Sequence, residues 1–495
     1  MSKHIIVIGA GIAGLSAASY LLRNGYQVTV LEKHMEPGGL CTSWKRKGYT
    51  IDYCIHWMMG TREGTEFHPL WQDLGAFTNA DGSPVPIVNF DTFTTLELST
   101  GESVCLSSNL ENVRDTFLAF APEDEKEILK FYKTLKTMAG TTSTNPLVKK
   151  ISGFRQLMAL MSHLLPMQEY ANRFESPQLR ELFLTEIPSD WSLVSLTMGL
   201  AQQPLKSAGY PVGGSLNIAR NIARLIEEKG GVIRYKSDVH TIMVSDDKAI
   251  GVTLSDGTTV SADYVISAAD GYATLYSMLD GAYVSEPYKK AFGEYPVFPS
   301  TVMAAFGIHK DLSSFTHASS LYLKEPIVFA DGTTQDRLNL NIYHYDPTLA
   351  PKGCTLVTVL FNTWETEAWV TLAQEHPAKY KAEKQRIADE VLKRLEQVFG
   401  SLEGLVDMVD VSTPNSVVHY TSNWKGSFEG FAPTKTTLSK RLPKKLPGLA
   451  NFAMIGQWTT PGGGLPTAAK DGHDIAKMLC KEDGKPFRTS WDGQR

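Results

Sequence analysis

The sequence predicts an α/β fold organised on a parallel sheet whose first strand ends in a nucleotide-binding turn. Three neighbouring features lead to this prediction. Residues His4 to Ile8 form a short apolar run rich in β-branched side chains, as expected of a buried strand. A glycine-rich turn at 9–14 follows directly and leads into an amphipathic helix over 15–24. A second strand over 26–31 then closes with the carboxylate of Glu32.

The glycines of the turn have separate physical roles, which together predict a Rossmann-like dinucleotide site. Gly9 permits the tight turn, Gly11 lets the backbone approach a pyrophosphate, and Gly14 lets the helix pack close to the strand. The helix N-terminus presents free N–H groups and the positive end of its dipole to the phosphates. Glu32 can accept both ribose hydroxyls of an adenosine and repels a 2′-phosphate. A glycine turn without a nucleotide is the alternative, but strands, helix and acid lie in register.

A second glycine pair indicates which dinucleotide is bound. Lys33 follows the acid, and Gly38 and Gly39 come soon after it, so the chain can cross close over a flat cofactor. With these residues, the segment 9–39 resembles the flavin-binding fingerprint of the phytoene desaturase, amine oxidase and protoporphyrinogen oxidase superfamily. That superfamily usually has Arg after the glycine pair, whereas this chain has Leu40. The resemblance implies FAD, and no cationic contact is expected from position 40.

Two later regions extend the resemblance. A helix over 216–229 and strands between 232 and 269 resemble the second half of the family's flavin domain. By this resemblance, the backbone of Val239 contacts the adenine and Ala269 passes near the pyrophosphate. Near the C-terminus, a strand over 453–456 is followed by glycines and a proline that begin the last helix, as in the family's C-terminal flavin motif. The N-terminus of that helix stabilises negative charge at the flavin N1–C2 edge.

Three separated segments are therefore expected to build one FAD-binding domain, with an α+β substrate-binding domain inserted between them. The expected fold is a discontinuous two-domain flavoprotein. The FAD-binding segments are 1–85, 205–285 and 445–482. The substrate-binding segments are 86–204 and 286–444, and residues 483–495 form a polar tail. The predicted cofactor-binding residues are Gly9, Gly11, Ala13, Gly14, Glu32, Lys33, Gly38, Gly39, Leu40, Val239, Ala269, Gly456, Gly463, Gly464, Leu465 and Pro466.

Length and composition limit the function classes. A chain of 495 residues is too long for one compact core, so two or more domains are expected. A net charge of −5 argues against nucleic acid as a partner. The five cysteines are dispersed without a C-x-x-C pair, which predicts reduced thiols in a cytoplasmic protein and no metal site. No stretch reaches the roughly 18 apolar residues of a spanning helix.

One segment predicts contact with a membrane surface. Residues 146–166 carry apolar side chains at helical spacing, namely Leu147, Ile151, Phe154, Met158, Met161 and Leu165. Lys149, Lys150 and Arg155 add positive charge near its start. A basic helix with an apolar face can lie in the membrane interface, here peripherally on the inner face. Packing in the core, or as a lid over a pocket, is the alternative interpretation of the same stripe.

The resemblance is nearest to the phytoene desaturase, carotenoid isomerase and retinol saturase group. It implies an FAD-dependent oxidoreductase that transfers hydride at flavin N5 to or from a C–C or C=C bond of an isoprenoid or other long-chain lipid. The result is desaturation, saturation or cis–trans isomerisation of a hydrophobic small molecule. The single GxGxxG turn indicates no built-in second domain for NAD(P)H, so electrons are exchanged with a quinone, with oxygen or with no partner.

A proton must also move, and three side chains are candidate catalytic residues. They are His56, Tyr210 and His344. For each of them, a packed or surface residue is the favoured interpretation.

Two other functions remain open from the sequence. A flavin amine oxidase often attaches its flavin through a C-terminal Cys, but Cys480 lies beyond the motif helix, so non-covalent FAD is expected. A non-catalytic prenyl- or lipid-binding protein of the GDP-dissociation-inhibitor type shares the fold and needs no flavin. The complete glycine set together with Glu32 argues against that second alternative.

Overall fold

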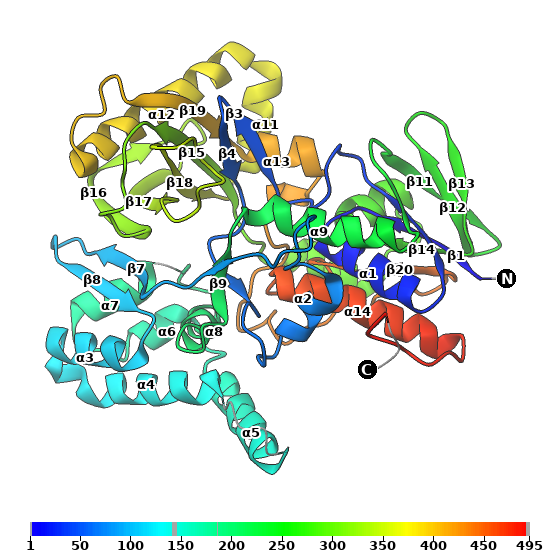
Figure 1. The fold of residues 1–495 in the computed structure, drawn as a ribbon, viewed down its shortest axis with the longest axis horizontal. Coiled ribbons are helices and arrows are strands. Elements are labelled where there is room, and N and C mark those ends of the chain that lie inside the picture. The colour runs from blue at the N-terminus through cyan, green and yellow to red at the C-terminus, as the bar shows by residue number, and fades with distance from the viewer. Residues whose placement is uncertain (1, 141–145, 186, 492–495) are drawn as a thin grey trace.

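A five-stranded parallel sheet forms the centre of the nucleotide-binding half of the molecule. The computed structural model describes residues 2–140, 146–185 and 187–491. In it the strand order is β10-β2-β1-β14-β20, and every pairing is parallel. The strands are β1 (His4–Ile8), β2 (Gln27–Leu31), β10 (Val232–Arg234), β14 (Tyr264–Ser267) and β20 (Phe452–Met454). Segments far apart in the sequence therefore combine into one sheet, at the right of Figure 1.

The two faces of this sheet are covered by different layers. Ile5 and Val7 of β1 pack in one core cluster with helices α1 (Ile12–Arg23), α9 (Gly214–Glu228) and α14 (Leu465–Glu482). Ile6 and Ile8 point to the opposite face, because side chains alternate along a strand. There they meet an antiparallel sheet of β11 (Val239–Ser245), β12 (Lys248–Leu254) and β13 (Thr259–Ser261). Burial on both faces explains the continuous apolar run of β1.

A seven-stranded sheet organises the other half of the molecule. Its order is β19-β15-β18-β17-β16-β7-β8. The strands are β7 (Thr92–Glu97), β8 (Ser103–Ser107), β15 (Ser300–Ile308), β16 (Ala318–Val328), β17 (Thr334–Ile342), β18 (Thr355–Thr363) and β19 (Val406–Ser412). Helices α11 (Thr366–Glu375), α12 (Pro377–Phe399) and α13 (Pro414–Thr421) accompany it. The sequence predicts β7, β8, β15, β18 and α12, but it gives no prediction for β16, β17 or β19.

Helices form a separate layer below β7 and β8 in Figure 1. They are α3 (Leu110–Phe120), α4 (Glu125–Ala139), α5 (Pro146–Ser162), α6 (Met167–Ala171), α7 (Pro177–Thr185) and α8 (Val194–Gln202). The helix predicted over 146–166 ends at Ser162, and Pro166 disfavours helical geometry at Leu165. Leu165 instead packs in the core of this layer. Over the residues that the structure describes, no helix is both long and apolar enough for a membrane crossing.

Smaller elements connect the two halves. The predicted hairpin over 44–52 is present as β3 (Ser43–Arg46) and β4 (Tyr49–Asp52). A short sheet joins β5 (Met58–Met59), β9 (Ala208–Pro211) and β6 (Ile87–Val88). Helices α2 (His68–Leu74) and α10 (Glu286–Glu294) are the remaining α-helices of the described residues.

Both large sheets draw their strands from the segments assigned to them in the sequence. The parallel sheet uses only strands within 1–85, 205–285 and 445–482, and the seven-stranded sheet uses only strands within 86–204 and 286–444. The domain boundaries themselves stay a prediction.

The segment expected to be a polar tail makes specific contacts with the nucleotide-binding half. Phe487 packs against Tyr20 and His473, and the guanidinium of Arg23 lies over the ring of Trp491. Residues 483–491 therefore dock on α1 and α14.

Candidate cofactor and active site

A cavity of about 1180 Å³ opens at the carboxyl edge of the parallel sheet. Ile8, Leu31 and Ala268, at or just after the ends of β1, β2 and β14, line it. The far wall comes from the β3–β4 hairpin, β19 and α13, so the cavity lies between the two large sheets. Ligands of open α/β sheets bind at this edge. The volume exceeds the roughly 300–1000 Å³ that holds a drug-sized ligand, which leaves room for a dinucleotide and more.

The first glycine turn forms an open cradle on the cavity wall. A Cβ atom placed on Gly11 would meet no other atom within 4 Å, so the space in front of this residue is free. A Cβ on Gly14 would lie 2.0 Å from the carbonyl oxygen of Gly9, and so no side chain fits there. The helix α1 therefore starts close against β1, with Gly14 in its first turn, earlier than the predicted start at residue 15.

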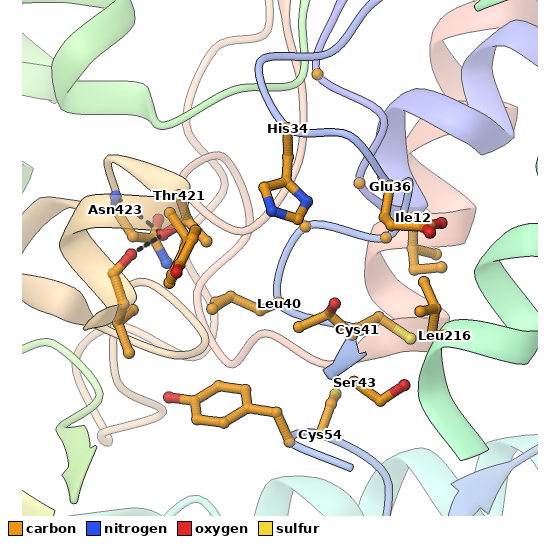
Figure 2. Close-up of a pocket in the computed structure, with 18 of the residues that line it drawn as sticks. Ile12, His34, Glu36, Leu40, Cys41, Ser43, Cys54, Leu216, Thr421 and Asn423 are labelled. Atoms are coloured by element: carbon orange, nitrogen blue, oxygen red, sulfur yellow. Dashed lines mark hydrogen bonds between the residues drawn. The ribbon is translucent and has the colours of Figure 1, made fainter. Parts of the chain in front are cut away.

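The second glycine pair crosses over the first turn. The Gly38 N–H donates to the carbonyl of Ala10 at 2.8 Å, and Gly38 pairs with Gly11 in an isolated parallel bridge. Gly38 has a φ of +113°, and a Cβ on it would lie 2.2 Å from the carbonyl oxygen of Cys41. Figure 2 shows Leu40, Cys41 and Ser43 following this crossing into the cavity wall, between Ile12 and Leu216 on one side and Thr421 and Asn423 on the other.

The carboxylate of Glu32 is held in place by backbone donors. Its Oε2 accepts from the Ala10 N–H at 2.7 Å, and its Oε1 accepts from the His34 N–H at 2.8 Å. The side chain is buried and lines the cavity. Each carboxylate oxygen has two acceptor sites, so both keep one for a ribose hydroxyl.

The C-terminal motif, residues 456–466, forms another part of the cavity wall, apart from the glycine turn and Glu32. Gly456, Gly464 and Leu465 line it, and α14 begins at Leu465 with Pro466 in its first turn. Gly464 has a φ of +90°, which favours glycine over any residue with a side chain. The first-turn N–H groups of α14 are left without intrahelical partners, so this end attracts negative charge.

Most of the predicted cofactor-binding residues meet in this one cavity. Those that line it are Gly9, Gly11, Ala13, Glu32, Lys33, Gly38, Gly39, Leu40, Val239, Ala269, Gly456, Gly464 and Leu465. The other three, Gly14, Gly463 and Pro466, are not among the lining residues and belong to the turns that support it. The open cradle at Gly11, the anchored acid and the two helix N-termini fit the pyrophosphate, ribose and flavin of FAD.

Comparison with known proteins agrees with this site. The family described as flavin-containing amine oxidoreductase matches residues 12–479. The chain belongs to this family. It is accordingly an FAD-dependent oxidoreductase.

Relatives of this flavoprotein extend over nearly its whole length. It is 25% identical to a chloroplastic prolycopene isomerase of Daucus carota, over 97% of this chain and 81% of the relative. It is 26% identical to a neurosporene-forming phytoene desaturase of Rhodobacter capsulatus, over 96% of this chain and 93% of the relative. The solved structure of an oxidoreductase from Methanosarcina mazei has the same fold, with a TM-score of 0.61 at 19% identity, covering 96% of this chain and 100% of that one.

The three predicted catalytic residues lie outside the cavity lining. His56 Nδ1 is 3.2 Å from the hydroxyl of Tyr343, and burial lowers the pKa of His56 to about 4. The hydroxyl of Tyr210 donates to Asp346 at 3.0 Å from a fully buried position. His344 is half-buried, and burial lowers its pKa. None of the three is among the described residues that line the cavity, so their catalytic roles stay unsupported by position.

Among the cavity acids that sequence reasoning missed, one has no hydrogen-bond partner for its carboxyl group among the described residues. Glu429 lies beside the C-terminal motif, because a Cβ on Gly463 would be 3.0 Å from Glu429 Oε2. Burial raises the pKa of Glu429 to about 7. No described residue forms a hydrogen bond with its carboxyl group. The only sequence signal is its place in residues 426–430, a short run of glycines around an aromatic side chain.

Every other acid of the cavity lining has a protein partner. Glu36 binds Arg220, Asp238 accepts from Ser255, Asp270 accepts from the Trp424 N–H, Asp410 accepts from Trp44, and Glu32 accepts from Ala10 and His34. Glu429 is thus the cavity acid that is left available to a ligand.

Replacing Glu32 tests the ribose contact. Glu32→Ala removes a charged acceptor, which is expected to weaken FAD binding by about 1–3 kcal/mol, or roughly 5- to 150-fold in Kd. Flavin titration of the deflavinated protein measures this. Glu36→Gln is the control, since its carboxylate pairs with Arg220 at the same cavity. An unchanged Kd in Glu32→Ala would place the ribose elsewhere.

Proposed function

We propose that this flavoprotein desaturates, saturates or isomerises C–C and C=C bonds of an isoprenoid or another long-chain lipid, with FAD held non-covalently. The observation that carries the proposal is the shape of the cavity, which continues past the cofactor loops onto an apolar and aromatic wall. The residues of that wall come from the N-terminal segment around the β3–β4 hairpin and from the segment 349–428. They include Trp44, Tyr53, Leu349, Val411, Val417 and Phe428. Relatives whose names specify prolycopene and phytoene support the same substrate class.

In this proposal the chain positions the cofactor and the lipid, excludes water from the reacting bond and exchanges a proton with the substrate. FAD, when bound, supplies the hydride chemistry at N5. The glycine cradle and Glu32 would hold its dinucleotide part, and the first-turn N–H groups of α14 would stabilise negative charge on its ring. The aromatic wall holds the lipid and keeps water from the reacting bond.

Glu429 is proposed as the acid–base residue of this reaction. Formation or breakage of a C–H bond by hydride transfer leaves a proton to be given or taken at the neighbouring carbon. Glu429 has the required position beside the C-terminal motif and a pKa near neutrality, which suits general acid–base work. Burial keeps His56 neutral near pH 7 and the cavity lining does not include it, so it is less suited.

The amine oxidase alternative has less support from the structure. Cys480 is fully buried in α14, and it is not among the described residues that line the cavity. A bond from this thiol to the flavin would therefore need a large rearrangement.

Absorption spectra and product analysis test the function. The visible spectrum of the purified protein, repeated on the supernatant after acid precipitation, is expected to show flavin bands that move to the supernatant.

The protein is then incubated with an acyclic cis-carotene, with and without a quinone or oxygen, and the products are separated by chromatography. A changed double-bond pattern supports the proposal. Flavin retained in the pellet, or turnover of a primary amine with no change in the carotene, would contradict it.

The role of Glu429 predicts a pH dependence. A proton donor works below a pH of about 7 and a proton acceptor above it, so the rate profile is expected to bend near pH 7. In Glu429→Gln the rate falls by about 100-fold or more, and this bend disappears. A bend that persists in the variant would assign it to another group.

Thermal stability gives a second measurement for the same residue. The folded chain holds the Glu429 proton more tightly than the unfolded chain does, because burial raises the pKa from 4.5 to about 7. The protonated Glu429 side chain therefore makes its full contribution to the stability of the folded state below pH 4.5. This contribution is lost as the pH rises through about 7. Glu429→Gln lacks this loss, so its Tm is expected to fall less than that of the wild type between about pH 5 and 8.

Contact with the inner face of a membrane completes the proposal. Helix α5 projects from the helical layer in Figure 1, and it leaves a set of apolar side chains between 48% and 66% exposed. These side chains are Ile151, Phe154, Leu157, Met158 and Met161. Lys150 and Arg155 are exposed on the same helix and complement anionic headgroups. The side chains of Leu147 and Lys149 lie outside the described residues.

Flotation with vesicles tests this contact. The protein is expected to float with vesicles that contain anionic lipid. The double variant Phe154→Asp/Met158→Asp should reduce the bound fraction about tenfold or more, since burial of each side chain contributes about 1.5–3 kcal/mol. Val328→Asp, which changes an exposed apolar residue of β16, serves as the control. Equal flotation of wild type and double variant, or no flotation at low salt, would remove α5 as the contact.

A further inference from the structure

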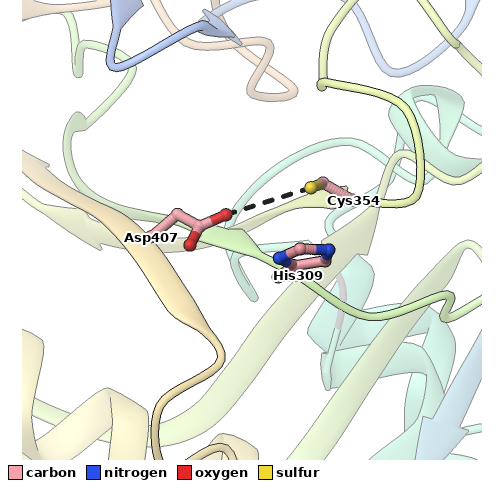
Figure 3. A group of neighbouring side chains, drawn as sticks. All are labelled: His309, Cys354 and Asp407. Atoms are coloured by element: carbon pink, nitrogen blue, oxygen red, sulfur yellow. Dashed lines mark hydrogen bonds between the residues drawn. The ribbon is translucent and has the colours of Figure 1, made fainter.

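Three chemically different side chains meet at one end of the seven-stranded sheet, away from the flavin cavity. β15 is the middle strand of the trio β19-β15-β18, and its last residue, Ile308, pairs with Thr355 of β18 and Val406 of β19. The residues next to these three are His309, Cys354 and Asp407. Figure 3 shows their side chains pointing toward one another.

The distances suit a shared ligand. One ligand atom from each of the three residues lies within 4.8 Å of the other two, and Cys354 Sγ is 3.9 Å from Asp407 Oδ2. No described residue forms a hydrogen bond with the imidazole of His309. His309 and Asp407 are exposed and Cys354 is half-buried, so an ion can reach the group from solvent.

We infer that His309, Cys354 and Asp407 form a binding site for a divalent zinc ion. A thiolate, an imidazole and a carboxylate are the ligand types that zinc accepts, and three protein ligands with water as the fourth is a common zinc arrangement. Magnesium and calcium prefer oxygen ligands alone. On binding, a Zn–S bond forms as the S–H bond of Cys354 breaks, and one proton passes to the buffer. The carboxylate and the neutral imidazole bind without losing a proton.

Supporting residues orient the carboxylate. The hydroxyl of Tyr49 donates to Asp407 Oδ2 at 2.9 Å. Lys47 Nζ binds the backbone carbonyl of Asp407 at 3.1 Å and leaves the carboxylate to the metal. A ligating carboxylate with a hydrogen bond from a neighbour is usual in zinc sites.

The site connects the sheet to the wall of the flavin cavity. Tyr49 belongs to β4, and its ring packs over Gly307, where a Cβ would lie 2.5 Å from the ring. Trp44 and Thr50 of the same β3–β4 hairpin line the cavity. A zinc ion on Asp407 would therefore fix the end of the hairpin that closes the cavity. This inference does not depend on the proposed substrate.

Zinc binding to the intact flavoprotein tests the site. After removal of metals with a chelator, equilibrium dialysis against zinc is expected to give one ion per chain. Cys354→Ser should lower the affinity by more than about 100-fold, and Tyr49→Phe by about 10- to 100-fold. Cys105→Ser and His376→Ala change another exposed thiol and another exposed imidazole, and they should bind as the wild type does. Flavin content confirms that each variant is folded.

Two measurements on the wild type need no variant. Calorimetry in buffers of different ionisation enthalpy should show about one proton released per zinc ion. Zinc should also slow alkylation of Cys354 relative to Cys105 in the same molecule, as followed by mass spectrometry. Binding that is not stoichiometric, equal binding in Cys354→Ser, or alkylation of Cys354 that zinc does not slow would each overturn the inference.

Discussion

The backbone of Ala10 is the point on which the cofactor site depends. Its N–H donates to Glu32 Oε2 at 2.7 Å, and its carbonyl accepts from the Gly38 N–H at 2.8 Å. One residue thereby joins the turn after β1, the acid after β2 and the second glycine pair. Hydrogen bonds to a charged group contribute about 1.5–3 kcal/mol each, so the Glu32 contact fixes the turn firmly. The first amides of α1 then face an open space at Gly11.

Two buried carboxylates hold the rest of the cavity together. Asp52, at the end of the β3–β4 hairpin, accepts from the N–H of Ser215 at 2.6 Å and so satisfies an unpaired amide at the start of α9. Asp346 accepts from the Gly213 N–H at 2.8 Å and from the hydroxyl of Tyr210 at 3.0 Å. The turn before α9 is thus bound from both sides. This explains why Tyr210, a candidate acid in the sequence, has a structural contact.

The cofactor end of the site could be predicted from the sequence because its determinants are local. Gly9, Gly11, Gly14 and Glu32 are close in sequence, and each is explained by backbone geometry, by the approach of the pyrophosphate or by the ribose. Strands β16, β17 and β19 could not be predicted in the same way, since pairing with distant strands decides them and β-propensity depends on that context.

The side chains that do chemistry depend on longer-range packing. Glu429 carries no local signal of its role, because the pKa that distinguishes it comes from burial beside Gly463. His309, Cys354 and Asp407 are separated by 45 and 53 residues in the chain, so no spacing rule for metal ligands finds them. The sequence therefore predicted no metal site, and only the register of β19, β15 and β18 brings the three together.

Burial shifts the pKa values of acidic and basic side chains in opposite directions. This limits which side chains can exchange a proton near neutral pH. Removal from water disfavours the charged form of any group. It lowers the pKa of His56 to about 4, which leaves a neutral imidazole, and it raises the pKa of Glu429 to about 7, which keeps its proton available near neutrality. The burial that would suit the proposed lipid substrate therefore also keeps a carboxylic acid protonated near neutral pH. For this reason, we assign the proposed acid–base role to Glu429 and not to the imidazoles around the cavity.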